Sequence, residues 1–185
     1  SGKNEPNHEL QFIGPGFEQL TRRVLTDVGI TAKKVKYKNR DCDVAFVLEE
    51  DVLFLCECKG RFQVSDFRSY VELETELIKE AAEQHRKTCD YFENNLHHIR
   101  NRLALPPTWM PSKVIRIIVT SAKLGREKID NNFYVIDENM FYAFFSRTKP
   151  SIRALNSRQS TFMPDARLDG PITVDAFIEY MNDPP

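Results

Sequence analysis

The chain has 185 residues, of which 41% are hydrophobic and 29% are charged, and its net charge at pH 7 is −1. This length favours one domain with its own core, and the near-zero charge argues against a protein that binds nucleic acid over its whole surface. No apolar run approaches the ~20 residues of a membrane span and no signal peptide is visible, so we expect no membrane partner and a cytoplasmic location.

The first predicted element is a helix that opens at Pro15. Its apolar positions recur at helical spacing along one face: Phe17, Leu20, Val24 and Val28. Gly29 follows as a stop signal. Glu18 lies beside the apolar stripe in the first turn, where a negative charge is favoured by the helix dipole. Glu18 is therefore either a helix-stabilising residue or one that faces an edge of the sheet, and both can hold at once.

A basic segment follows this helix. On a strand, alternate side chains share one face, so the sequence predicts a basic stripe of Lys34, Lys36, Lys38 and Arg40. Such a stripe is suited to hold the phosphate groups of nucleic acid. The alternative is an edge strand that lysines protect against aggregation.

Residues 43–48 and 52–59 are predicted to form two antiparallel strands joined by an acidic turn. Glu57 and Lys59 are two residues apart and share a face, and the hairpin brings Asp43 near Glu57. Two carboxylates and an amine suit a hard divalent cation such as Mg²⁺ or Mn²⁺. Asp41 competes with Asp43 for this role but falls two residues back in a turn. The alternative is an ion pair that marks where the strand reaches solvent.

Residues 72–103 are predicted to form one long amphipathic helix. Its apolar positions are Leu73, Leu77, Ala81, Cys89, Phe92, Leu96, Ile99 and Leu103. Gln84, Thr88 and Tyr91 share one edge of this helix. Strands at 114–120 and 133–137 follow, and then a short helix at 137–145 with Asp137 as its cap. This order predicts an α/β fold in which helices flank a central mixed β-sheet.

The order of the candidate residues resembles the PD-(D/E)xK nuclease superfamily. Asp43 followed by Glu57-x-Lys59 after a hairpin is similar to its signature, and Gly14-Pro15-Gly16-Phe17-Glu18 is similar to the Gly-x-x-Phe-Glu helix of its Mrr-like group. Gln84 matches a Gln of RecB-type members, whereas Tyr91 lies seven residues on instead of four. Val119-Thr120-Ser121 is similar to a strand end of Mrr-like domains.

The resemblance covers residues 12 to 146 and implies a restriction-endonuclease-like fold and a Mg²⁺- or Mn²⁺-dependent deoxyribonuclease that acts as an endonuclease. It implies that Asp43, Glu57 and the Cys58 backbone carbonyl hold the metal. Glu18 then assists a second ion or the water network, Lys59 orients the attacking water or stabilises the transition state, and Gln84 positions the site. DNA is the expected partner, bound through Lys34, Lys36, Lys38 and Arg40.

We expect residues 1–150 to form the nuclease-like domain and residues 151–185 to be a C-terminal extension that leads to a linker of a larger protein. Another domain or a partner protein would then supply targeting. The alternative function is a catalytically inactive nuclease-like module that binds nucleic acid or a protein. The cysteines lack paired zinc spacing and are expected to be small buried residues: Cys42, Cys56, Cys58 and Cys89.

Overall fold

The computed structural model describes residues 10–60, 66–122, 126–149, 151–153, 160–162 and 164–183. The helices are α1 (Leu10–Asp27), α2 (Phe67–Thr75), α3 (Ala82–Asn94), α4 (Leu96–Leu103), α5 (Glu138–Ser146) and α6 (Val174–Asn182), with a π-helical segment η1 (Glu76–Ala81) and a 3-10 turn η2 (Ala166–Leu168). The strands are β1 (Ala32–Tyr37), β2 (Arg40–Leu48), β3 (Val52–Lys59), β4 (Lys113–Thr120), β5 (Arg126–Asp130), β6 (Phe133–Asp137), β7 (Ser151–Arg153) and β8 (Ser160–Phe162).

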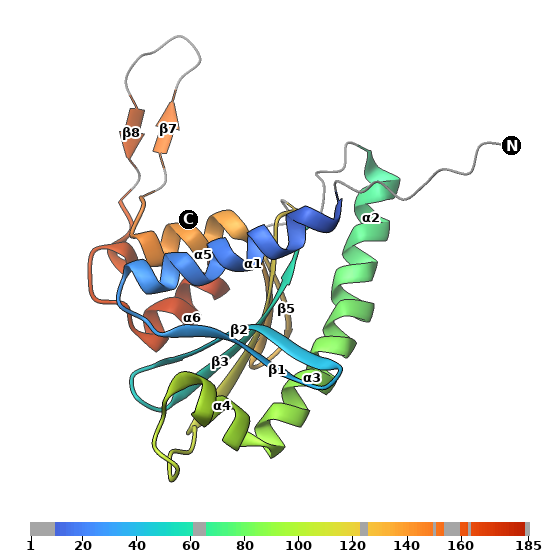
Figure 1. Cartoon of the computed structure of the whole chain (residues 1–185). Helices are drawn as coiled ribbons and strands as arrows, with labels where there is room; N and C mark the ends of the chain where they lie inside the picture. The colour runs from blue at the N-terminus through green and yellow to red at the C-terminus, as the bar shows by residue number, and fades with distance from the viewer. Residues whose placement is uncertain are drawn as a thin grey trace, which may run out of the picture.

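A six-stranded mixed sheet forms the centre of the molecule, in the order β1-β2-β3-β4-β6-β5 (Figure 1). β1, β2 and β3 are antiparallel neighbours, β4 and β6 run parallel to β3, and β5 returns antiparallel to β6. Helices α1, α5 and α6 pack on one face of the sheet, and α3 and α4 pack on the other. The predicted mixed sheet flanked by helices is therefore confirmed.

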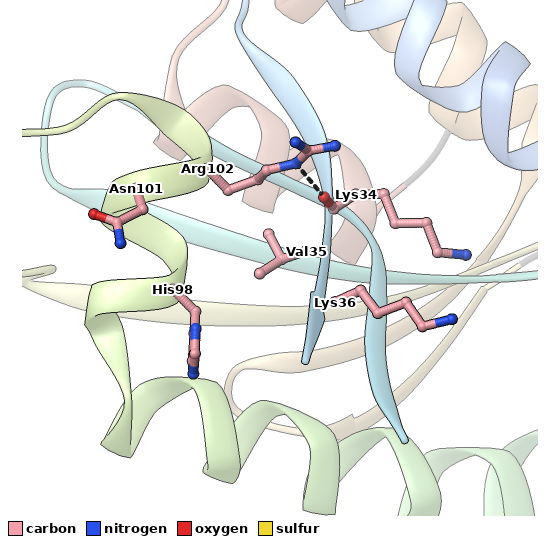
Figure 2. A pocket seen from close by; sticks show the side chains of 6 residues that line it. All are labelled: Lys34, Val35, Lys36, His98, Asn101 and Arg102. Atoms are coloured by element: carbon pink, nitrogen blue, oxygen red, sulfur yellow. Dashed lines mark hydrogen bonds between the residues drawn. The ribbon is translucent and has the colours of Figure 1, made fainter. Parts of the chain in front are cut away.

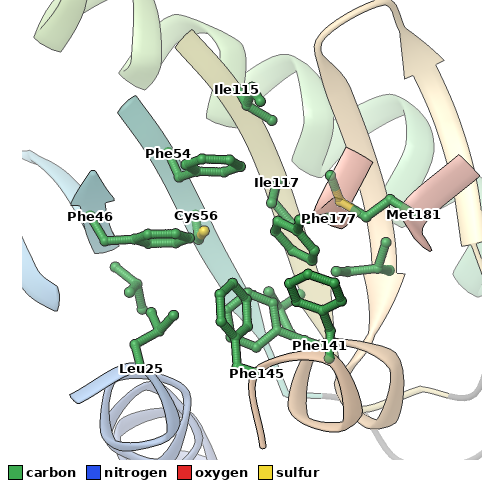
Figure 3. Close-up of a cluster of buried hydrophobic side chains, with 14 of the residues drawn as sticks. Leu25, Phe46, Phe54, Cys56, Ile115, Ile117, Phe141, Phe145, Phe177 and Met181 are labelled. Atoms are coloured by element: carbon green, nitrogen blue, oxygen red, sulfur yellow. The ribbon is translucent and has the colours of Figure 1, made fainter. Parts of the chain in front are cut away.

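An aromatic core fills the space between the sheet and the helices α1, α5 and α6 (Figure 3). Phe46 and Phe54 stack on neighbouring strands with ring centroids 4.7 Å apart. Phe177 of α6 packs against Phe144 and Phe145 of α5 at 4.7 and 4.8 Å. Offset and edge-on contacts of this kind add to the burial of the rings themselves.

Helix α1 differs from its prediction in both its start and its buried face. It begins at Leu10 and carries Pro15 within it. Leu25 is fully buried and Thr21 lies beside it in the core, whereas Leu20 is 48% exposed. The buried positions Phe17, Thr21 and Leu25 are four residues apart, so the core-facing stripe is rotated around the helix from the predicted one, away from Leu20.

The long helix predicted over residues 72–103 is wrong in its start and its continuity, although α4 ends at Leu103 as predicted. The helical run begins at Phe67, passes through η1 and ends at Asn94. Asn95 leaves the helical region with φ −132° and ψ 52°, and its side-chain amide donates to the Tyr91 carbonyl. Helix α4 therefore starts anew and packs against β1 and β2. The side chains of Leu73 and Leu77 lie outside the described residues.

The end of the chain returns to the same core. Helix α6 contributes Val174, Phe177, Tyr180 and Met181 to the aromatic core. The Val174 amide donates to Glu49 in the β2–β3 turn at 3.1 Å. The core thus extends past the boundary expected at residue 150.

The predicted elements after residue 110 are confirmed as β4, β6 and α5, whereas β5, β7, β8 and α6 were not predicted. Strand β6 covers the predicted residues, and α5 is capped as expected, because Asp137 Oδ1 accepts the Met140 amide at 3.0 Å. Strand β5 occupies a segment between two predicted strands for which no element was predicted. Throughout the part of the chain that the structure describes, no helix is long and apolar enough to cross a membrane.

Candidate active site

Asp43 lies where strands β2 and β3 stop pairing through their backbones. The ladder runs from Leu48 opposite Val52 to Val44 opposite Cys56. At the next position the Asp43 carboxylate replaces a backbone partner, since its Oδ2 accepts the Cys58 amide at 2.9 Å. The carboxylate is thereby held between two strands, with only 8% of its side chain exposed.

A β-bulge in β2 turns Asp43 towards β1. Lys33 pairs with Ala45 and Val35 pairs with Cys42, so two residues of β2, Asp43 and Val44, lie opposite the single residue Lys34. Bulges of this kind re-aim side chains and are common beside active sites. Here the bulge explains why Lys34 and Asp43 meet.

The ammonium group of Lys34 sits among three carboxylates. Its Nζ lies 2.8 Å from Glu18 Oε2, 2.9 Å from Asp43 Oδ1 and 3.2 Å from Asp41 Oδ2. Burial alone would lower the pKa of Lys34, but the hydrogen bonds and charges of Glu18 and Asp43 raise it above its ordinary value. Lys34 therefore stays charged and offsets part of the negative charge of these three carboxylates.

Arg22 of α1 ties the helix to the same strand. Its Nη1 donates to the Asp43 carbonyl at 2.9 Å and lies 3.6 Å from Glu18 Oε2. Glu18 is therefore held between Arg22 and Lys34, close to Asp43, because this face of α1 is turned towards the sheet. The structure thus places Glu18 next to Asp43, with the Lys34 ammonium between their carboxylates.

Glu57 and Lys59 form a second charged pair on β3. Lys59 Nζ lies 2.8 Å from Glu57 Oε1. Burial raises the pKa of the Glu57 carboxyl, the Asp43 carboxylate raises it further, and Lys59 opposes both, which leaves the pKa above 4.5. The influence of Asp43 on Glu57 reflects the proximity that the hairpin predicted.

His85 of α3 also lies next to Glu57. Its Nε2 donates to the Leu55 carbonyl at 3.0 Å, because a carbonyl can only accept, and its Nδ1 lies 3.9 Å from Glu57 Oε2. Burial lowers the pKa of His85 to about 4. His85 is therefore neutral at pH 7, and its Nδ1 lies 3.8 Å from Cys89 Sγ as well as 3.9 Å from Glu57 Oε2.

The chemistry of these donors fits a hard divalent cation, although the ligands are not gathered as a metal would hold them. Within the described side chains, no group of three His, Cys, Asp or Glu residues is placed to hold a metal ion. Asp43, Glu57 and Glu18 nevertheless supply the carboxylate oxygens that Mg²⁺ and Mn²⁺ prefer. The ammonium of Lys34 lies between carboxylate oxygens of this kind and is the cation that they contact in this structure.

The predicted basic stripe is not one strand face. Strand β1 ends at Tyr37, and Lys38 lies in the following turn with φ 53°. Arg40 belongs to β2, where it donates to the Lys87 carbonyl and lies over the Tyr91 ring. Of the four basic residues, Lys34 is engaged by the carboxylates and Lys36 is exposed on β1.

A groove between β1 and α4 lies next to the acidic cluster (Figure 2). It is lined by Lys34, Val35, Lys36, His98, Asn101 and Arg102. Arg102 Nε donates to the Lys34 carbonyl at 2.9 Å, while the side chains of Lys34 and Lys36 both point away from α4. The residues that line the groove include basic residues and no acidic one.

Sequence reasoning missed Arg22, His85 and Arg102. Gln84 was expected to position the site, but it is exposed on α3, and its neighbour His85 is the residue that faces Glu57. The signal for His85 was present, because Ala81, His85 and Cys89 follow one another at four-residue steps along the apolar edge. Comparison of the chain with protein-family models, curated proteins and solved structures finds no match to any of them.

Proposed function

We propose that this chain is a metal-dependent endonuclease domain that hydrolyses DNA phosphodiester bonds and is targeted by another domain or partner. The observation that carries the proposal is the placement of Asp43. Its carboxylate is fixed between β2 and β3 by the Cys58 amide, beside Glu57 and Lys59. We also propose that the α/β fold is of the restriction-endonuclease-like type.

In this proposal Asp43 and Glu57 hold Mg²⁺ or Mn²⁺, with the Cys58 carbonyl and Glu18 as further ligands. The metal, when bound, lowers the pKa of its water and offsets charge on the phosphate. Lys59 places a positive charge within 2.8 Å of Glu57, where it can orient the water or the phosphate oxygen. The neutral ring of His85 shields one side of the Glu57 carboxylate from solvent.

Basic side chains on and beside β1 support DNA as the partner. Lys36 is exposed and points to the same side of β1 as Lys34, whose ammonium contacts the carboxylates, while Arg102 of α4 lines the groove on the other side (Figure 2). A basic surface next to a metal site positions phosphates without reading bases, so we expect little sequence preference from the domain alone. Lys38, in the exposed β1–β2 turn, is a further candidate for a phosphate contact.

A plasmid-nicking assay with Mg²⁺, with Mn²⁺ and with EDTA tests the function. We expect nicking with either metal, none with EDTA, and none from Asp43→Asn or Glu57→Gln. The Asn and Gln side chains keep the shape and the accepting oxygen but lose the charge. Glu50→Gln, which changes an exposed carboxylate in the β2–β3 turn, is the matched control and should nick as the parent does.

The inactive binding module is the second candidate. It is favoured by the pairing of Asp43 with Lys34 and of Glu57 with Lys59, which leaves both carboxylates neutralised by the chain itself. A parent protein that binds DNA but neither nicks it nor binds Mn²⁺ would establish this function instead.

A further inference from the structure

We propose that the ammonium group of Lys34 is a resident cation that holds the acidic cluster of Glu18, Asp41 and Asp43 together and competes with a divalent metal for Asp43. This inference rests on the proposed function and assigns the control of metal occupancy at the same site. Lys34 would have to leave Asp43 for the metal to bind fully.

The contacts of Asp43 define the competition. Oδ2 accepts the Cys58 amide, which is part of the sheet and cannot move away. Oδ1 is held by Lys34 Nζ at 2.9 Å, and this partner is a flexible side chain. A divalent cation that approaches Asp43 therefore gains access by displacing the ammonium, not the amide.

The backbone of Lys34 is fixed, whereas its side chain can change rotamer. Its carbonyl accepts the Arg102 guanidinium at 2.9 Å, and its neighbours pair with β2. The side chain is 31% exposed, and it points away from α4 on the same side of β1 as Lys36 (Figure 2). Displacement thus needs a change of rotamer that breaks the ion pairs of Lys34, and it needs no movement of the backbone.

The carboxylates explain why the ammonium is needed without metal. Glu18 and Asp43 are mostly buried, with 18% and 8% of their side chains exposed. Buried like charges repel each other strongly unless a cation lies between them. Lys34 supplies that cation, and a divalent ion would supply a stronger one.

Calorimetry with Mn²⁺ on the parent, Lys34→Gln and Lys33→Gln tests the proposal. We expect the Kd of Lys34→Gln for Mn²⁺ to be lower by about ten-fold or more, because a competing charge within 3 Å is removed. Lys33→Gln removes the same charge from the exposed neighbour on β1, so its Kd should stay within about two-fold of the parent value.

Thermal unfolding provides a second readout. Without metal, Lys34→Gln should melt below the parent, because Glu18, Asp41 and Asp43 lose their shared cation. Saturating Mn²⁺ should raise the Tm of the variant by more than that of the parent, since tighter binding stabilises the folded state more. Lys34→Met, which keeps the aliphatic stem, serves if Lys34→Gln does not fold without metal.

The outcomes separate this inference from the proposed function. If the parent binds Mn²⁺ and the Lys34 variants bind it no more tightly, the competition is disproved and the proposed function stands. If neither the parent nor the variants bind Mn²⁺, both ideas fail. Binding by the Lys34 variants alone would show that the ammonium blocks the site completely.

Discussion

Contacts of single residues hold the two central carboxylates of the candidate site. Asp43 is held by Lys34 and the Cys58 amide, and Glu57 is held by Lys59. The sequence predicted that the hairpin brings Asp43 near Glu57, and in the structure the Asp43 charge raises the pKa of Glu57. It assigned Lys34 to phosphate binding, because the bulge that turns this residue towards Asp43 has no sequence signal of its own.

Lys59 is expected to serve chemistry more than binding. Lys59→Met should lower the nicking rate by about a hundred-fold or more, because a charge beside the reacting phosphate is lost. DNA affinity should change by less than about three-fold, since one lysine is a small share of the phosphate contacts.

Lys36→Met on the exposed face of β1 is the matched comparison, and it should weaken DNA binding and reduce the dependence of that binding on salt. Nicking by Lys59→Met at the parent rate would remove this residue from the site.

His85 should make stability dependent on pH. Its pKa falls from 6.5 in the unfolded chain to about 4 in the folded protein, so only the unfolded chain takes up a proton between these values. The free energy of unfolding should therefore decrease as pH falls through this range, by up to about 3 kcal/mol from this residue. Urea unfolding at several pH values measures the effect, and His85→Gln should show a weaker decrease.

Glu57 acts in the opposite direction and must be separated from His85. Its raised pKa means that the folded protein takes up a proton more readily than the unfolded chain, so its contribution increases as pH falls. Because both proteins in the comparison carry Glu57, the difference between the parent and His85→Gln reports on His85. An identical pH dependence in the two would show that His85 does not titrate as expected.

At the scale of elements, regular patterns were predictable and interruptions were not. The apolar runs of β3, β4 and β6 identified these strands, and Asp137 identified the start of α5. The break at Asn95 was missed because α4 continues the same apolar periodicity after it. Strand β5 was missed because its residues, Arg126–Asp130, are mostly charged and give no strand signal.

The buried face of α1 offers a direct test on one helix. Leu25 is fully buried and Leu20 is 48% exposed, although the sequence pattern favoured Leu20. Leu25→Ala should lower the free energy of unfolding by about 2–5 kcal/mol, because it leaves a cavity in the core. Leu20→Ala is the control, and its loss should stay below about 1 kcal/mol. Equal losses in urea unfolding would show that α1 packs through a different face.

At the scale of the whole molecule, the last helix completes the core that supports the site. Phe177 of α6 is fully buried and packs against Phe54 of β3, the strand that carries Glu57 and Lys59. The sequence predicted only an extension after residue 150, because α6 is short and its partners lie far away in the chain. Long-range packing of this kind leaves little local signal.

Replacement of Phe177 should therefore destabilise the whole protein. Phe177→Ala should lower the free energy of unfolding by about 3–5 kcal/mol, because a large ring is removed from a packed aromatic core. Glu179→Ala, on the exposed side of the same helix, should change it by less than about 0.5 kcal/mol. If Phe177→Ala unfolded in urea like the parent, α6 would not belong to this core.

Metal binding at Asp43 is the central claim, and calorimetry with Mn²⁺ tests it without knowledge of the DNA substrate or of a targeting partner. We expect the parent and the Glu50→Gln control to bind Mn²⁺, and Asp43→Asn to bind it at least about ten-fold more weakly, because a charged oxygen ligand is lost. Asp43→Asn keeps an oxygen for the Cys58 amide, so it should remain folded. Binding of Mn²⁺ by Asp43→Asn with the affinity of the parent would contradict the assignment of this site.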